Sequence, residues 1–244
     1  MLPLPAILLP VNARELSSLS AAAGFPVFHV GAVGSTQDWV KARLAEIPPP
    51  FAVLADHQTA GRGRRGSPWY DEPGASLILS AALNLSGLPF RPELLPLAVG
   101  LAVARELEGL GVKGVRIKWP NDILVGGEKI CGILVETVFS GGLRVAVAGM
   151  GLNVDRAPFG TCLREHAPDA DRLQLAGDLL SALPELGFDP AAYAARDYLR
   201  GRRVRVGEVS GEAAGIDASG ALVVRRDEGG FERVHAGEVR VEHW

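Results

Sequence analysis

Residues 114–136 read GVRIKWPNDILVGGEKICGILVE, and this stretch separates the fold classes open to the chain. Apolar and polar residues alternate over 114–119, as is typical of a strand, and a proline corner follows. A second strand, 123–125, reaches Gly126-Gly127, a strong hairpin signal before the strand 129–136. Strands joined by turns this short run antiparallel, because a parallel crossover needs about a dozen residues or more.

The pattern of strands and helices continues on both sides of this hairpin. Further strands are predicted at 27–30, 51–57, 75–84 and 143–149, and helices at 13–23, from 36 to the prolines 48–50, at 93–110 and as a pair within 171–200. The helices stand beside the strands rather than strictly between them. The predicted fold is therefore α+β, with a mixed, largely antiparallel sheet flanked by helices, and a doubly wound parallel sheet is disfavoured.

From Gly201 onward the sequence pattern changes from mixed helices and strands to short strands only. Short alternating strands at 202–206, 213–216, 221–225 and 238–241 are separated by glycine-rich turns, with no helical pattern between them. This predicts a small barrel-like β module at 201–244. It follows a main domain at 1–200, whose residues 1–26 form a short N-terminal extension.

Composition limits the classes of function. With 48% hydrophobic and 22% charged residues the chain is typical of a soluble globular protein, and its net charge of −3 argues against a general polyanion binder. Cys131 and Cys162 form no disulfide framework or metal-ligand pattern, which suits a reducing cytosol. The apolar start contains three prolines and no basic segment, and no run is long enough to span a bilayer. A cytoplasmic protein without a membrane partner is expected.

Two stretches carry chemistry. Residues 61–69, GRGRRGSPW, bring three glycines and three arginines into one loop, which can offer backbone N–H groups and guanidinium groups to a polyanion. Alone, this loop fits a solvated surface segment equally well. Lys118 ends a buried-looking strand, where a lysine is rarely placed without a partner, and it can act as a point charge for a phosphate or oxyanion. The alternative is an edge-strand lysine before a Pro-Asn-Asp turn.

Taken together, four motifs resemble the motif series of the biotin protein ligases in order and spacing, from Ser35 to the C-terminal module. They are GRGRRG with Trp69, KWPND at 118–122, GILVE at 132–136 and GMGLNV at 149–154. The resemblance implies a catalytic domain like that of class II aminoacyl-tRNA synthetases and an SH3-like C-terminal barrel. It also implies ATP-dependent activation of biotin to biotinyl-5′-AMP, with Mg²⁺ arriving on ATP. The biotinyl group then passes to a lysine of a biotin carboxyl carrier domain, that of acetyl-CoA carboxylase, and a homodimer paired through sheet edges is also implied.

The same resemblance implies the residues of the site. On the biotin side they are Ser35, Thr36, Gln37, Gln58, Gly61, Arg62, Gly63, Lys118, Gly132 and Gly151. On the adenylate side they are Arg64, Arg65, Trp69, Lys118, Asn121 and Asn153, with Asp122 completing the corner. Arg62, Arg64 and Lys118 are the expected catalytic groups, because joining a carboxylate to a phosphate needs alignment and positive charge rather than a protein nucleophile. No protein metal site is expected, since Mg²⁺ takes most of its ligands from phosphates and water.

Several alternatives stay open. Ser35 and Thr36 also suit a helix N-cap, Gln37 stands where many relatives have Asn, and Ser67 and Pro68 replace residues that are often basic in the family. A lipoate or octanoate ligase would want a wholly apolar channel. A biotin-sensing repressor would need a DNA-binding domain, and the 26 residues before the first strand are too few for one. The acidic net charge argues against nucleic-acid binding by the arginine loop, so no DNA partner is expected.

Overall fold

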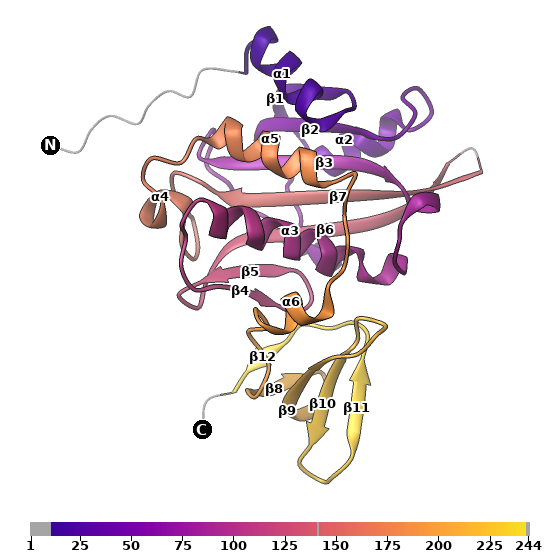
Figure 1. The fold of residues 1–244 in the computed structure, drawn as a ribbon, viewed down its shortest axis with the longest axis vertical. Coiled ribbons are helices and arrows are strands. Elements are labelled where there is room, and N and C mark those ends of the chain that lie inside the picture. Colours follow the sequence, from indigo (N-terminus) through magenta and orange to yellow (C-terminus); the bar gives the residue numbers. More distant parts are fainter. Residues whose placement is uncertain (1–10, 141, 243–244) are drawn as a thin grey trace, which may run out of the picture.

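The computed structural model describes residues 11–140 and 142–242, which form two β-sheets (Figure 1). The large sheet has seven strands in the order β1-β2-β3-β7-β6-β5-β4. Its strands are β1 (Val27–Val33), β2 (Phe51–Gln58), β3 (Ser76–Asn84), β4 (Val115–Lys118), β5 (Asp122–Val125), β6 (Glu128–Ser140) and β7 (Leu143–Asn153). Only β1 and β2 run parallel, and every other neighbouring pair is antiparallel. The predicted mixed, largely antiparallel sheet is confirmed.

The hairpin that the Gly-Gly pair predicted joins β5 to β6. Val125 lies opposite Glu128, and the two turn glycines have φ of 62° and 91°. A two-residue turn with positive φ at both positions matches the twist of the flanking strands, and glycine adopts it without a steric cost.

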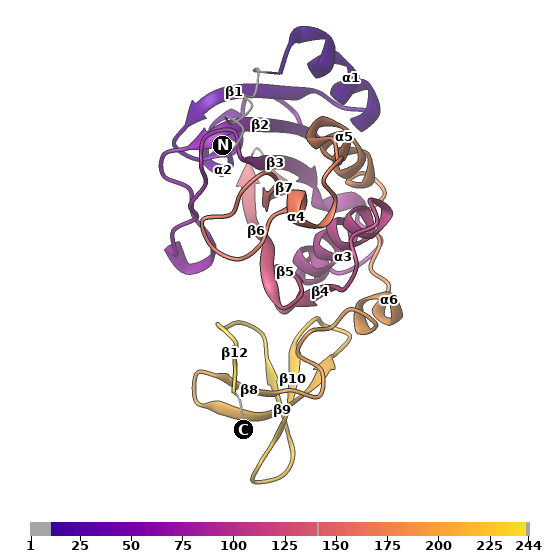
Figure 2. The same ribbon diagram turned by 90° about the vertical axis from the view of Figure 1, so that its left-hand side faces the viewer.

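Helices cover both faces of the large sheet. They are α1 (Ala13–Ala23), α2 (Thr36–Arg43), α3 (Leu95–Gly109), α4 (Leu163–His166), α5 (Arg172–Ala182) and α6 (Pro190–Ala194). Figure 2 shows α1, α3 and α5 on one face and α2 on the other. The first face holds the main core, into which the almost wholly apolar α3 buries nine residues. On the second face Val40 of α2 packs with Phe51 and Val53 of β2.

Part of the predicted N-terminal extension is tied to this core. Helix α1 begins with a capping box between Asn12 and Glu15, and it buries Leu19 and Ala23. The hydroxyl of Ser181 on α5 donates to the carbonyl of Ala22 at 3.1 Å. Residues 11–26 therefore pack on the main domain, while residues 1–10 of the predicted extension lie outside the described part.

The small sheet contains β8 (Arg203–Val206), β9 (Val209–Ile216), β10 (Leu222–Arg226), β11 (Phe231–Val234) and β12 (Arg240–Val241). Its order is β11-β10-β9-β8-β12, it is antiparallel throughout, and it lies beyond the β4 edge of the large sheet (Figure 1). This fits the predicted SH3-like barrel, although residues 243–244 lie outside the described part. The indole N–H of Trp119 donates to the carbonyl of Gly220 at 2.9 Å and links the two sheets.

No helix among the described residues is long and apolar enough to cross a membrane.

Candidate active site

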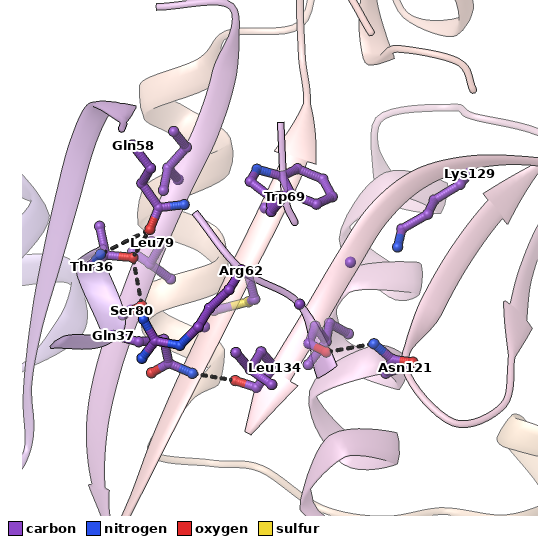
Figure 3. A pocket seen from close by; sticks show the side chains of 17 residues that line it. Thr36, Gln37, Gln58, Arg62, Trp69, Leu79, Ser80, Asn121, Lys129 and Leu134 are labelled. Atoms are coloured by element: carbon purple, nitrogen blue, oxygen red, sulfur yellow. Dashed lines mark hydrogen bonds between the residues drawn. The ribbon is translucent and has the colours of Figure 1, made fainter. Parts of the chain in front are cut away.

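Two adjoining cavities lie where the 61–69 loop folds over the α2 face of the large sheet. We call them the inner and the outer cavity. The inner cavity (Figure 3) is lined by Thr36, Gln37, Gln58, Arg62, Gly63, Trp69, Ile78, Leu79, Ser80, Asn121, Lys129, Gly132, Ile133, Leu134, Gly149, Met150 and Gly151. The outer cavity is lined by residues 63–67, 118–122, 129 and 237–239.

A short hydrogen-bond relay forms the polar end of the inner cavity. Gln58 Oε1 accepts from the backbone N–H of Thr36 at 2.8 Å and from its hydroxyl at 3.0 Å. The hydroxyl of Ser80 lies 2.8 Å from that of Thr36, so three side chains hold one another in place (Figure 3). Thr36 and Gln58 were predicted and are brought together. Ser80 was missed, although a fully buried serine inside the apolar strand β3 was a signal for it.

Gln37 also lies in this wall. Its amide nitrogen donates to the carbonyls of Leu134 at 2.8 Å and Val147 at 3.3 Å, which ties α2 to β6 and β7. Its Oε1 is buried and accepts no hydrogen bond within the described structure. An unpaired buried acceptor costs about 1–3 kcal/mol, so this oxygen favours a ligand that brings an N–H.

The arginine loop carries its own hydrogen bonds. Gly63 N–H donates to Ser67 O at 2.7 Å and Trp69 N–H to Gly61 O at 3.0 Å, so the loop is a small hairpin. A Cβ at Gly61 would lie 2.8 Å from the carbonyl oxygen of Trp69. Arg65 at the tip has φ of 55°, in the left-handed region. The glycines are needed for close approach of the backbone, as the sequence predicted.

Arg62 folds back over α2. Its guanidinium makes a two-pronged ion pair with Asp38, at 2.5 and 2.6 Å, and lies 3.8 Å from Glu136. Hydrogen bonding between Arg62 and Asp38 raises the pKa of the arginine and lowers the pKa of the carboxyl group. The pair fixes one end of the loop against the inner cavity.

The base of the loop is held by a second acid. Asp71, whose side chain has no exposed surface, lies 2.8 Å from Nδ1 of His57. The same carboxylate is 3.4 Å from the backbone nitrogen of Gln58. His57 thus anchors the loop beside Gln58 but does not line the inner cavity.

The Trp69 side chain reaches from the loop into the inner cavity (Figure 3). Its indole lies over the glycine floor of β6 and β7, where a Cβ would be 3.2 Å from the ring at Gly132 and 2.6 Å at Gly151. The remaining free volume is about 50 Å³, and a water molecule takes a share of roughly 30 Å³ in the liquid. The two floor glycines were expected to make room for a ligand, and in this structure they make room for the tryptophan.

The outer cavity, of about 500 Å³, is strongly cationic. Arg64, Arg65, Lys118 and Lys129 line it, against the carboxylates of Asp122 and Glu238. Burial lowers the pKa of Arg64, whose Nη1 donates to the carbonyl of Gly237 at 3.3 Å and so joins the loop to the C-terminal module. Such a cluster of guanidinium and ammonium groups suits a polyphosphate.

Lys129 is a second residue that sequence reasoning missed. It lines both cavities, its ammonium lies 2.6 Å from the Asp122 carboxylate, and it sits 5.6 Å from the centre of the Trp69 ring. Lys118, predicted for both sides, lines only the outer cavity. The signal for Lys129 was weak, because a lysine at the start of a strand is ordinarily a solvated edge residue.

Three other predicted residues line neither cavity. Ser35 is buried at the N-cap position of α2 without a side-chain capping bond. Gly61 lies at the start of the loop, where its backbone packs closely against that of Trp69. Asn153 donates from Nδ2 to the carbonyl of Thr161 at 3.1 Å, which holds the segment after β7, and its Oδ1 is buried without a partner among the described atoms.

Comparison with known proteins identifies the class. The biotin/lipoate A/B protein ligase family model matches residues 30–153, and the model of the biotin protein ligase C-terminal domain matches residues 200–241. These two matches place the chain among the biotin/lipoate protein ligases. The seven-stranded mixed sheet, the two cation-lined cavities and the C-terminal β module agree with this class.

Within this class the chain belongs to the biotin protein ligase family. The biotin–[acetyl-CoA-carboxylase] ligase of Mycobacterium tuberculosis is 35% identical over 94% of this chain and 95% of its own length. The bifunctional ligase/repressor BirA of Escherichia coli is 33% identical over 89% and 74%. The biotin protein ligase of Aquifex aeolicus, solved with biotin and ATP, superposes with a TM-score of 0.69 at 27% identity over 89% of this chain and 99% of that one.

Proposed function

We propose that this protein is an ATP-dependent biotin–[acetyl-CoA-carboxylase] ligase. It activates biotin as biotinyl-5′-AMP and transfers the biotinyl group to one lysine of a biotin carboxyl carrier protein. The observation that carries this proposal is the junction of the two cavities, where a small, polar-ended cavity meets a cationic one at Gly63, Asn121 and Lys129. Such a junction can hold a carboxylic acid against the α-phosphate of a nucleotide.

Biotin occupies the inner cavity in this proposal. Its ureido group meets the relay of Thr36, Gln58 and Ser80, and the buried Oε1 of Gln37 accepts one ureido N–H. The glycine floor at Gly132 and Gly151 lies under the ligand once Trp69 has moved aside. Arg62 closes the loop through Asp38. The polar relay disfavours lipoate or octanoate, which would leave these groups unpaired in a buried site.

ATP occupies the outer cavity, with Arg64, Arg65 and Lys118 on its phosphates. The biotin carboxylate oxygen attacks the α-phosphorus, an acyl–phosphate bond forms and the bond to pyrophosphate breaks. Lys118, which lines the outer cavity, and Lys129, which lines both cavities, stabilise the charge that develops on the reacting oxygens. An ATP-bound Mg²⁺ would neutralise phosphate charge here; phosphate and water would be most of its ligands, and Asp122 and Glu238 are the carboxylates of this cavity that would meet it.

The acceptor lysine then attacks the acyl carbonyl, the carbon–oxygen bond to the phosphate breaks, and AMP leaves as the amide forms. The amine proton passes to solvent water as the amide forms. Closure of the loop protects the mixed anhydride from hydrolysis until the carrier arrives.

The domain and partner proposals extend the same picture. The catalytic domain spans 1–200 and the SH3-like module 201–244.

The β4 edge of the large sheet is covered, because Ile117 N–H donates to Arg196 O at 2.8 Å and Tyr198 N–H to Ile117 O at 2.9 Å. Strand β1 is the other edge, and it is the surface through which a homodimer would pair. We place the enzyme in the cytoplasm, without DNA or membrane partners.

The test is biotin-dependent exchange of labelled pyrophosphate into ATP, which needs no carrier protein. Wild-type protein is expected to exchange with biotin and not with lipoate or octanoate. Lys118→Ala should reduce exchange by on the order of 10²–10³-fold, the loss typical of removing one group that stabilises developing charge. Arg14→Ala, which removes an exposed cation from α1, is the control and should exchange normally. Exchange driven by lipoate alone would refute the proposal.

A further inference from the structure

Among the described residues, cations without an ion pair cluster in two places, while others, such as Arg14 and Arg144, stand singly on the surface. One is the outer cavity. The other is a surface depression of about 520 Å³ lined by Lys113, Arg116, Arg200 and Arg202, which we call the basic patch. Among the described residues none of these four forms an ion pair with a carboxylate, whereas most other arginines of the molecule do. A chain with a net charge of −3 thus concentrates free positive charge here.

The one carboxylate in the depression is already engaged. Asp197 accepts from the backbone N–H groups of Leu199 at 2.9 Å and Arg200 at 3.3 Å. Arg202 stacks on the ring of Tyr198 at 4.3 Å, which orients its guanidinium at the surface. The patch therefore keeps a net positive charge, and the ring of Tyr198, its one aromatic side chain, is stacked against Arg202.

The patch adjoins the site through strand β4. Arg116 and Lys118 are two residues apart, so their side chains lie on the same face of the strand, roughly 7 Å from each other. Lys118 lines the outer cavity, and Arg116 lines the basic patch. Arg200 and Arg202 lie where the chain enters the small sheet, and the side-chain-free turn at 126–127 borders the depression.

We infer that the basic patch docks the carrier protein through acidic side chains that flank its acceptor lysine. This rests on the proposed function, whose second step must bring a protein lysine to the acyl–phosphate bond. Opposite charges on two surfaces raise the rate of encounter and fix the register of docking. Four cations and a single tyrosine ring that already stacks on Arg202 are too few for nucleic acid at physiological salt, where more phosphate contacts and several stacking aromatics are the norm.

The experiment compares two double variants of the full-length enzyme. Lys113→Glu/Arg200→Glu reverses two exposed charges in the patch. Arg14→Glu/Arg144→Glu reverses two exposed charges elsewhere, on α1 and at the start of β7, and gives the same net charge. For each, pyrophosphate exchange reports the first step, and transfer of biotin at varied carrier concentration reports the second.

The patch variant should exchange pyrophosphate like wild type while its KM for the carrier rises on the order of tenfold at low salt. The difference should shrink as salt is raised, because screening weakens charge pairing. A carrier with lysines in place of the acids near its acceptor lysine should restore transfer by the patch variant. A KM equal to that of the control double variant, or a rise that does not depend on salt, would overturn the inference.

Two further outcomes separate the proposals. If wild-type protein shows no biotin-dependent exchange, the proposed function fails, whatever the patch does. If exchange is normal and wild-type protein binds duplex DNA at physiological salt with an affinity that the patch variant loses, the patch serves nucleic acid and the docking inference is wrong. Should the double variant fold poorly, as judged by thermal unfolding, Lys113→Glu and Arg200→Glu alone carry the test.

Discussion

Three cations that line the two cavities differ in whether a carboxylate already pairs with them. Arg62 is committed to Asp38, and Lys129 is shared between Asp122 and the Trp69 ring. Lys118 has no ion pair with any described carboxylate and is free to meet a phosphate. Which of the three cations is paired depends on the three-dimensional position of the carboxylates, because the sequence alone does not distinguish them. In the proposed mechanism Lys118, the lysine of the KWPND motif, is therefore the cation expected to contact phosphate directly.

Gly151→Ala tests the contact between the floor and the loop. The new Cβ would lie 2.6 Å from the Trp69 ring, so the indole must move off the floor or push neighbouring side chains aside. Overpacking of this kind lowers the free energy of unfolding by about 1–3 kcal/mol. We expect a change in tryptophan emission without ligand and a raised KM for biotin. Gly31→Ala on β1, where a Cβ meets nothing within 4 Å, is the control. Unaltered emission and KM would mean that the ring does not occupy this floor.

Cys131 precedes the floor glycine Gly132 and should nevertheless be inert. Burial raises the pKa of its thiol to about 12, so almost no thiolate exists at pH 8. The pKa of the Cys162 thiol is also raised by burial. Native protein treated with iodoacetamide at pH 8 should keep its pyrophosphate exchange and its mass, while protein unfolded in urea should gain two adducts. Loss of exchange together with a modified Cys131 would contradict this.

Among the elements, the 61–69 loop is held to its surroundings by three polar attachments. Arg62 holds it to α2, and Arg64 holds it to the carbonyl of Gly237 in the small sheet. Asp71 anchors its base to His57. A loop held at these points by ion pairs and hydrogen bonds, rather than by buried apolar side chains, can open at modest cost and close again over a ligand.

Arg64→Ala tests the attachment to the small sheet. Hydrogen bonds made by charged groups contribute about 1.5–3 kcal/mol, so losing this one and the phosphate contact should speed escape of biotinyl-5′-AMP by roughly tenfold or more. The readout is free adenylate in solution, measured without carrier. Arg14→Ala again provides the control. A release rate equal to that of wild type would remove Arg64 from the closing mechanism.

For the whole molecule, the two sheets act as one frame around the outer cavity. The large sheet supplies β4, β5 and the loop, and the small sheet supplies residues 237–239. The bond from Trp119 to Gly220 and the bond from Arg64 to Gly237 cross the gap between them. The basic patch spans the same border, with Arg116 on one sheet and Arg200 at the entrance to the other. The outer cavity and the basic patch thus both depend on how the two sheets meet.

The sequence by itself determined the local elements and the class of protein. Alternating runs, the Gly126-Gly127 turn and the apolar 93–110 segment depend on neighbouring residues, and for that reason the antiparallel hairpin and the buried α3 were predicted correctly. The motif series identified the family through residue types at fixed spacing. The small β module was also found, although β11 and the full length of β9 were missed.

Only the tertiary structure decided which side chains meet. Ser80 and Lys129 join the site because β3 and β6 pass beside α2 and the loop, and no local pattern marks such a long-range neighbour. Lys118 belongs to the outer cavity alone, and Asn153 holds a backbone segment instead of lining either cavity. The physical reason is that contacts between elements depend on their packing in three dimensions, which residue type and spacing along one strand do not specify.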